Sequence, residues 1–263
     1  MAQANRWTRE QLIAAFTLYC QLPFGRLHRG TPEVIALAHA INRTPSAVAL
    51  KLVNFASFDP AILASGRSGM SNVSALDREI WDEFHADWNG YAVNGELFLE
   101  GAGAAPTLPN DTEVEPDTFP EGTTREVIIT VRRQQGFFRR TVLSSYRTQC
   151  CMSGIVDERL LTASHIVPWA LDQHNRLNPR NGLCLSALHD RAFDRFLLTV
   201  LPDGTIRVSA SIGRQSASLI MQAALLDLDG QHITLPERFQ PDPVLLRWHN
   251  AQFAARNTGA SLI

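Results

Sequence analysis

Apolar and polar residues follow two different periods along this chain. In the first 100 residues, apolar side chains recur every three or four positions, which is typical of amphipathic helices. The residues from Leu12 to Tyr19 show this spacing and follow Thr8 and Gln11, which have the pattern of a capping box. A further stripe over residues 76–88 predicts another helix of the same kind.

Two Thr-Pro pairs mark additional helix starts in this region. Thr31 and Thr44 each precede a proline, and threonine at the N-cap with proline at the first helical position favours a helix. The two short helices that follow, joined by a tight turn, resemble a helix-turn-helix. An ordinary helical bundle is the alternative, because the second helix carries only one charged residue. The side chains that would face DNA are Arg43, Ser46, Lys51 and Asn54.

The second half of the chain contains apolar stretches of strand length. The alternation in REVIITVR predicts a strand over residues 125–132, followed by a helix over 137–149. The segments LLTASHIVPW and NGLCLS predict two more strands, and the second leads directly into a helix, LHDRAFDRF. A hairpin about Asp203 and Gly204 and a closing helix over 243–256 complete the predicted order.

A segment without apolar periodicity separates these two halves. Residues 101–124 are rich in Gly, Pro, Thr and acidic side chains, which indicates a flexible acidic linker. We therefore predict an α+β chain with a helical, possibly DNA-binding domain over 1–100 and a second domain over 125–263.

Composition narrows the class of protein only moderately. With 45% hydrophobic and 19% charged residues and a net charge of −2, the sequence is typical of a globular protein. It contains neither an apolar run of membrane-spanning length nor a signal-like start, so we expect a cytoplasmic protein with no membrane partner. The four cysteines lack the spacing of a zinc site, which predicts buried, inert thiols.

The residues with candidate chemistry gather around the two central strands. Hydrolysis of a phosphodiester bond requires a base of near-neutral pKa and a divalent cation that stabilises negative charge. A histidine at the end of the first strand suits the base, and carboxylates or imidazoles on the following helix suit the cation. The candidates in chain order are His165, Asn181, His189, Asp190 and Asp194.

This order resembles the HNH endonuclease family, in which a strand, a strand and a helix form a ββα-metal fold. The matching residues are CCMSGI, LLTASHIVPW and NPRNGLCLSALHDRAFD, and the resemblance extends over residues 136–253. It is closest to the branch found in bacterial restriction and defence nucleases. The resemblance therefore implies a C-terminal nuclease domain.

The resemblance also assigns roles to particular residues. It implies that His165 is the general base and that Asn181 ties the loop and orients that histidine. Asp194, with either His189 or Asp190, would bind a divalent metal, with Mg²⁺ expected and Mn²⁺ or Zn²⁺ as alternatives. We expect the ring of His165 to face the helix of residues 189–194. One departure is Ser164, where many relatives carry a metal ligand.

These inferences predict a metal-dependent endonuclease that acts on double-stranded DNA in restriction or phage defence. A homodimer is favoured if both strands are cut. The alternative is a DNA-binding or regulatory protein whose HNH fold is catalytically inactive. Arginines can bind phosphate with two parallel hydrogen bonds. The predicted DNA contacts are Arg139, Arg140, Arg176 and Arg180, together with Arg43 and Lys51.

Overall fold

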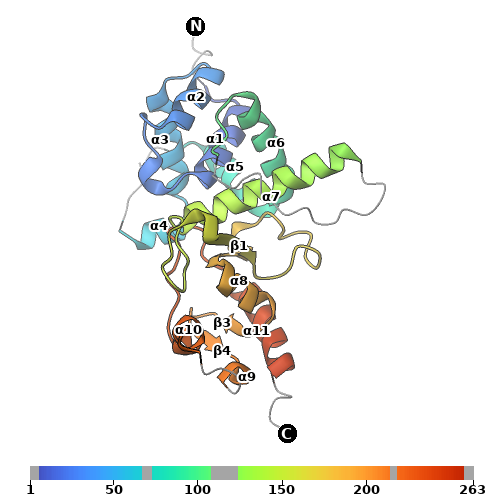
Figure 1. The fold of residues 1–263 in the computed structure, drawn as a ribbon. Helices are drawn as coiled ribbons and strands as arrows, with labels where there is room; N and C mark the ends of the chain where they lie inside the picture. Colours follow the sequence, from blue (N-terminus) through green and yellow to red (C-terminus); the bar gives the residue numbers. More distant parts are fainter. Residues whose placement is uncertain (1–5, 67–72, 108–123, 214–217, 258–263) are drawn as a thin grey trace.

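The computed structural model describes residues 6–66, 73–107, 124–213 and 218–257. The N-terminal helices form one end of the molecule, a long helix crosses its middle, and two small sheets with further helices form the other end (Figure 1). This mixture of helices and two antiparallel sheets confirms the α+β class. Within the described ranges, no helix combines the length and apolar character that crossing a bilayer requires.

The N-terminal region is helical, as predicted. Its first helix, α1, begins with the predicted capping box of Thr8 and Gln11 and is buried along most of its length. Phe16 lies at the centre of an aromatic cluster with Phe55, Trp81 and Phe84. The elements are α1 (Arg9–Gln21), η1 (Phe24–Arg26), α2 (Pro32–Ala40), α3 (Pro45–Ala56), α4 (Pro60–Ala64), α5 (Ala75–Ala86) and α6 (Trp88–Gly101).

Helices α2 and α3 form where the two Thr-Pro pairs predicted them, but α3 turns two of its predicted DNA contacts inward. The Lys51 ammonium lies 2.9 Å from both carboxylate oxygens of the fully buried Asp77. Asn54 is only 4% exposed. Lys51 therefore cannot reach a phosphate in this structure, and its prediction as a DNA contact is wrong. The helix-turn-helix itself stays a prediction.

The predicted strand over residues 125–132 is wrong. These residues form the first turns of α7 (Arg125–Ser145), a helix of 21 residues. Val127 and Ile129 remain 49% and 43% exposed, so their alternation reflects no buried sheet face. The helix is held instead by its second half, in which Phe137 and Phe138 are buried. Tertiary packing of one half thus overrides the local β-propensity of the other.

The C-terminal half carries the two sheets. β1 pairs with β2 and β3 pairs with β4, both antiparallel, and the second pair confirms the hairpin predicted about Asp203 and Gly204. Gly204 has a φ of +90°, which a glycine adopts without strain. The elements are η2 (Glu158–Leu160), β1 (Leu161–His165), η3 (Pro179–Asn181), β2 (Gly182–Ser186), α8 (Ala187–Asp194), β3 (Leu198–Val200), β4 (Ile206–Val208), α9 (Ala210–Gly213), α10 (Leu219–Ala224), η4 (Leu226–Leu228) and α11 (Pro243–Asn257).

The two halves share one hydrophobic core rather than meeting only through a linker. Arg238, which is 0% exposed, donates hydrogen bonds to the carbonyl oxygens of Tyr19, Cys20 and Leu22 at the end of α1. Most of the predicted linker, residues 108–123, lies outside the described residues. The division into domains at 1–100 and 125–263 stays a prediction. Arg238 belongs to the second of these predicted domains and connects it to α1, which belongs to the first.

Candidate active site

Strands β1 and β2 and helix α8 form a compact unit packed against α7. The register pairs His165, the last residue of β1, with Gly182, the first of β2. A Cβ atom on Gly182 would lie 2.4 Å from Val142 Cγ2 and 3.0 Å from Phe138 Cζ. Only glycine therefore lets β2 approach α7 so closely. The Asn181-Gly182 pair is thus more than a turn signal, since it seats the strand pair on the helix.

The imidazole of His165 lies flat against α7. Its ring stacks on Phe138 with centroids 3.8 Å apart and planes 8° apart, and Trp169 meets it edge-on. The expectation that this ring faces the helix of residues 189–194 is therefore wrong. Successive side chains of a strand point to opposite sides, so the neighbouring Ser164 is the residue directed toward α8.

One nitrogen of the His165 ring is fixed by the protein and the other is not. Nε2 lies 3.0 Å from the carbonyl oxygen of Arg176. Because a carbonyl can only accept, Nε2 carries the proton and Nδ1 keeps its lone pair. Nδ1 makes no hydrogen bond to any residue that the structure describes. Burial lowers the pKa of His165 to about 4, opposed by the Arg176 carbonyl, so the ring is neutral at pH 7.

Asn181 holds the loop that begins at His165. Its side chain is fully buried, and its Oδ1 accepts a hydrogen bond of 2.8 Å from the Val167 backbone N–H. Its Nδ2 donates to the carbonyl oxygens of Val167 and Asn175, at 3.0 Å and 3.2 Å. These bonds fix both ends of the loop whose Arg176 carbonyl receives His165 Nε2. A positioning role for Asn181 requires contacts of this kind, and the role itself stays a prediction.

A hydroxyl and two carboxylates meet on the other side of β1. The Ser164 side-chain oxygen is buried without a well-formed hydrogen bond, yet it lies close enough to Asp190 to lower the pKa of that carboxyl. Burial is the larger effect and, with the nearby Asp194 carboxylate, raises the pKa of Asp190 to about 6. Burial also raises the pKa of Asp194, which Arg191 and Arg195 partly oppose. Asp190 and Asp194 lie one turn apart on α8.

The donor set on α8 fits a hard cation better than it fits zinc. No group of three or more His, Cys, Asp or Glu side chains gathers as a metal site within the described ranges. Mg²⁺, however, is usually bound through one or two carboxylates, with water and substrate phosphate completing its shell. Asp190 and Asp194, with the unsatisfied Ser164 hydroxyl beside them, offer oxygen ligands of that kind. Zn²⁺ prefers nitrogen and sulfur ligands in a closed site, which is missing here.

His189, the alternative ligand, is occupied elsewhere. It is 2% exposed, with Nε2 2.8 Å from the Ala224 carbonyl oxygen and Nδ1 3.4 Å from the Cys150 sulfur. The Cys150 sulfur also accepts from the backbone N–H groups of Ser153 and Ser186. Burial opposes ionisation of this thiol, but the hydrogen bonds from His189 and Ser153 lower the pKa of Cys150 to about 6. This thiol is buried, as predicted, but its lowered pKa does not fit the inert thiol that was expected.

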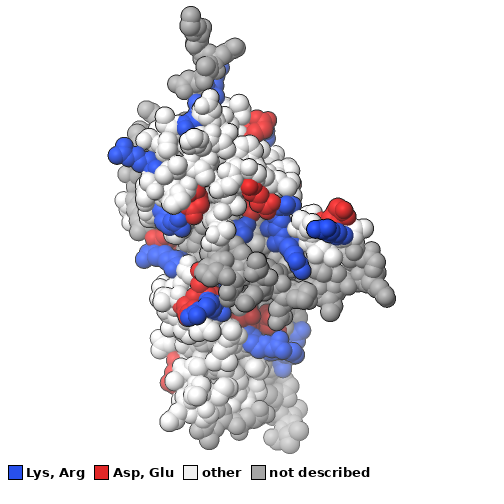
Figure 2. All heavy atoms as spheres, turned by 45° about the horizontal axis from the view of Figure 1, so that its top comes forward, with Lys and Arg blue, Asp and Glu red and all other residues white. Residues whose placement is uncertain are grey.

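The predicted arginines occupy different environments. Arg140 is 9% exposed and forms a buried ion pair with Glu96, so it cannot reach DNA in this structure and that prediction is wrong. Arg139 donates to the carbonyl oxygens of Leu161, at the start of β1, and of Glu158 in η2. On the face drawn in Figure 2, basic side chains form several separate groups with acidic residues near most of them.

The remaining arginines are more accessible. Arg176 donates from Nε to the Trp169 carbonyl oxygen and stacks on that indole, in the loop next to His165. Arg180 has a side chain 41% exposed and lies 3.3 Å from an Asp242 carboxylate oxygen. Arg43, half-buried, lies over the Trp7 ring in the N-terminal helices. These three, with Arg139, stay predictions as DNA contacts.

The strand pair β1–β2 and helix α8 form a ββα unit that carries a neutral histidine on one side of β1 and two carboxylates on the other. Residues 150–201 match the family model described as HNH endonuclease. The match covers β1, β2, α8 and β3, so it confirms the family predicted for this segment. No curated protein matches the chain.

Two features of the site were missed by sequence reasoning. The Phe138 ring that carries His165 comes from α7, whose residues 125–132 had been predicted as a strand. The Arg176 carbonyl is a backbone group, which no side-chain pattern can reveal. A signal did exist for Cys150, since a cysteine and a histidine flank the same strand pair, but only the folded chain brings them together.

Proposed function

We propose that this protein is a metal-dependent endonuclease that hydrolyses phosphodiester bonds in double-stranded DNA, with His165 as the general base. The observation that carries the proposal is the state of the His165 ring. Nε2 is held by the Arg176 carbonyl, the ring is neutral at pH 7, and Nδ1 is left to take a proton from water. The match of residues 150–201 to the HNH endonuclease family supports the same chemistry.

The other residues of the site position this base and the phosphate. Asn181 keeps the loop in the conformation that presents the Arg176 carbonyl to Nε2. Asp190 and Asp194 would hold a divalent ion such as Mg²⁺, which supplies stabilisation of the negative charge on the phosphate and the departing oxygen. Arg176 and Arg180, on the loop and at its end, are suited to bind neighbouring phosphates.

Cleavage of plasmid DNA tests the proposal directly. We expect nicking or linearisation by the purified full chain with Mg²⁺ or Mn²⁺, none with EDTA, and a large loss in the His165→Ala variant. His174→Ala is the matched control, because His174 is an exposed histidine of the same loop. Binding of DNA without metal-dependent cutting would overturn the proposal in favour of a catalytically inactive HNH fold.

A role in restriction or phage defence is the finer part of this proposal and rests on the family resemblance alone. We expect cells that produce the protein to plate phage less efficiently than cells that produce His165→Ala. A homodimer, which would bring two sites to the two strands, is checked by sedimentation with and without duplex DNA. Equal plating by the two strains would remove the defence role and leave the nuclease activity untouched.

A further inference from the structure

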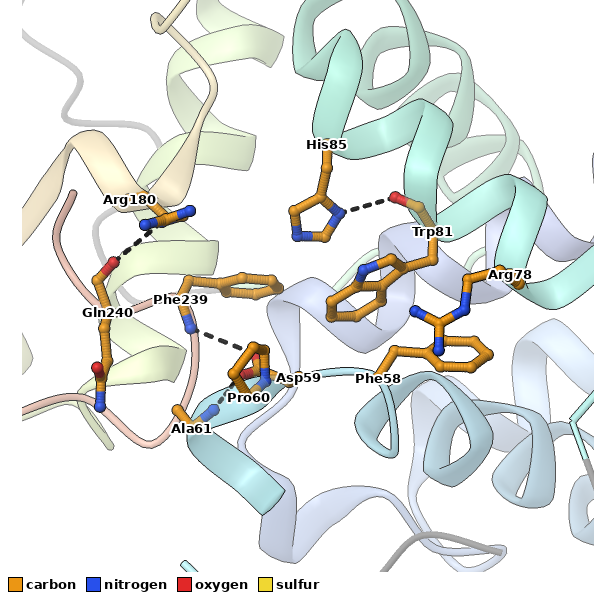
Figure 3. Close-up of a pocket in the computed structure, with 10 residues that line it drawn as sticks. All are labelled: Phe58, Asp59, Pro60, Ala61, Arg78, Trp81, His85, Arg180, Phe239 and Gln240. Atoms are coloured by element: carbon orange, nitrogen blue, oxygen red, sulfur yellow. Dashed lines mark hydrogen bonds between the residues drawn. The ribbon is translucent and has the colours of Figure 1, made fainter. Parts of the chain in front are cut away.

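A cavity lies outside the ββα unit, between the N-terminal helices and the C-terminal segment. It has a volume of about 380 Å³, which is within the range of small-molecule sites. Its lining comes from α5, from residues 58–61 before and at the start of α4, from η3 and from residues 239–240 (Figure 3). The strand pair of the candidate active site does not contribute to it.

Four of the ten residues that line this cavity carry aromatic rings, and the lining also includes Asp59, whose carboxylate accepts hydrogen bonds from the backbone N–H groups of Ala61 and Phe239. Phe58 and Trp81 meet with ring centroids 5.7 Å apart, and the His85 imidazole stacks on Trp81 at 4.3 Å. Phe239 enters from the opposite side, at the C-terminal segment (Figure 3). Rings with several orientations around one hollow offer surfaces for stacking and edge contacts with another planar ring.

His85 adds a hydrogen-bond acceptor to this apolar lining. Its Nδ1 lies 2.7 Å from the Trp81 carbonyl oxygen, so Nδ1 carries the proton and Nε2 keeps a lone pair. Nε2 makes no hydrogen bond to any part of the chain that the structure describes. Burial lowers the pKa of His85, which keeps the ring neutral and Nε2 an acceptor.

Two guanidinium groups stand on opposite sides of the cavity (Figure 3). Arg78 is exposed and its guanidinium lies over the Phe58 ring at 3.7 Å, where it forms no hydrogen bond or ion pair with the described residues. Arg180 enters from η3, where it is bonded to the Gln240 carbonyl oxygen at 3.3 Å and faces Asp242. A guanidinium placed in this way can bind a phosphate group with two parallel hydrogen bonds.

We propose that this cavity binds a single nucleotide unit, with the base among Phe58, Trp81 and Phe239 and the phosphate at Arg78, while Arg180 adds positive charge on the other side of the cavity. The aromatic rings favour a planar ligand, the His85 acceptor favours one with N–H groups at its edge, and the arginines favour an anion. A nucleotide combines all three properties. Its source is either a free mononucleotide or an unpaired nucleotide of DNA. The site adjoins Asn181 through Arg180, so its occupant would lie against the end of the loop that positions His165.

Calorimetric titration of the full chain in EDTA tests this proposal without any cleavage. We expect AMP, GMP, CMP or TMP to bind more tightly than inorganic phosphate or the corresponding nucleoside. Loss of one charged hydrogen-bonding partner in Arg78→Ala should weaken nucleotide binding about tenfold. Arg256→Ala is the matched control, because Arg256 is exposed and lies over Phe196 at the same 3.7 Å, far from the cavity lining.

A second variant separates the base from the phosphate. His85→Phe keeps a ring beside Trp81 but removes the acceptor, so nucleotide affinity should fall about fivefold while phosphate affinity is unchanged. A duplex with one unpaired nucleotide, set beside the perfect duplex, identifies the source of the ligand. Binding to either the mononucleotides or the unpaired site that depends on Arg78 supports the proposal.

Two results would overturn the proposal. One is the absence of any Arg78-dependent binding by mononucleotides or by the unpaired duplex. The other is equal binding of phosphate and nucleotide, which would leave only an anion site. Because the titrations contain no metal, a protein that binds nucleotides but cuts no DNA would refute the proposed nuclease function and not this site.

Discussion

Two histidines in the C-terminal half lie in nearly the same surroundings. His165 stacks on Phe138 at 3.8 Å with planes 8° apart, and His249 stacks on Phe193 at 3.7 Å with planes 6° apart. In both, Nε2 lies near a backbone carbonyl oxygen, at 3.0 Å and 3.2 Å, and burial lowers the pKa to about 4.

The two rings differ at the other nitrogen. Nδ1 of His249 lies 2.7 Å from the Thr199 hydroxyl, whereas Nδ1 of His165 has no hydrogen-bond partner in the described structure. Burial, stacking and a lowered pKa are thus shared by a ring with a packing role and one with a proposed chemical role. The nitrogen left without a partner is the feature that separates them.

The largest expected effect is on the cleavage rate. Replacement of a general base lowers a rate by about 10² to 10⁴, so His165→Ala should lose that much in single-turnover cleavage of plasmid DNA. His249→Ala, compared at equal amounts of folded protein, should stay within about threefold of wild type, because its ring touches no substrate in the proposed mechanism. Equal losses in the two variants would show that the free nitrogen does not distinguish the rings.

When stability is measured, His249→Ala should be the variant with the large effect. His249 is 2% exposed, so His249→Ala opens a cavity and leaves the Thr199 hydroxyl and Phe193 carbonyl with weaker partners. We expect a loss of about 2 to 4 kcal/mol in the free energy of unfolding, measured with urea. His174→Ala, on the exposed loop, should change it by less than about 0.5 kcal/mol. A small loss in His249→Ala would contradict the packing role.

Asn181→Ala should lower both the cleavage rate and the free energy of unfolding, unlike either histidine variant, in which one of the two changes more. Its three hydrogen bonds to the loop disappear, and the unfolding free energy should fall by about 2 kcal/mol. The cleavage rate of the folded fraction should also fall by about 10- to 100-fold, because the loop no longer holds His165 in place. A variant that loses stability but keeps its rate would limit Asn181 to a structural role.

The shared pKa shift gives a prediction for pH dependence. Each ring takes up a proton at about pH 4 in the folded state and near pH 6.5 in the unfolded chain, so the unfolded state binds more protons between these values. Each histidine therefore makes its full contribution to the free energy of unfolding above pH 6.5, and this contribution falls as the pH is lowered toward 4.

Over this window each histidine adds a slope of up to about 1.4 kcal/mol per pH unit. Asp190, whose pKa is raised to about 6, acts in the opposite direction below that pH. Urea unfolding at several pH values between 4.5 and 7 should show a shallower slope in His249→Ala than in wild type. An unchanged slope would contradict the lowered pKa of His249.

The smallest effect tests the comparison by making the two rings alike. Thr199→Val removes the hydroxyl bonded to His249 Nδ1 with little change in volume, and also one of the acceptors of Asn250. We expect a loss of about 1 kcal/mol in unfolding free energy and no change in cleavage rate. A changed rate in the folded variant would mean that the region around His249 influences the active site.

The sequence predicted the ββα unit of the candidate active site better than its surroundings. The order of His165, Asn181 and the α8 carboxylates was recoverable because strand, strand and helix are contiguous and short. The sequence did not reveal that Lys51 pairs with Asp77 or that Arg140 pairs with Glu96, because each partner comes from a distant element. The β-branched residues at the start of α7 led to the wrong strand prediction over residues 125–132 for a similar reason, because the packing of residues further along the chain determined their conformation.

The buried Arg238 has a consequence for any attempt to transplant this ββα unit. Its guanidinium closes the carbonyl end of α1, and it also touches the Ser144 hydroxyl of α7. A fragment beginning at residue 125 would leave this cation in an apolar surface with no acceptors from α1. Grafting the ββα unit onto another protein would therefore require carrying the first helix with it, or replacing Arg238 with an apolar side chain.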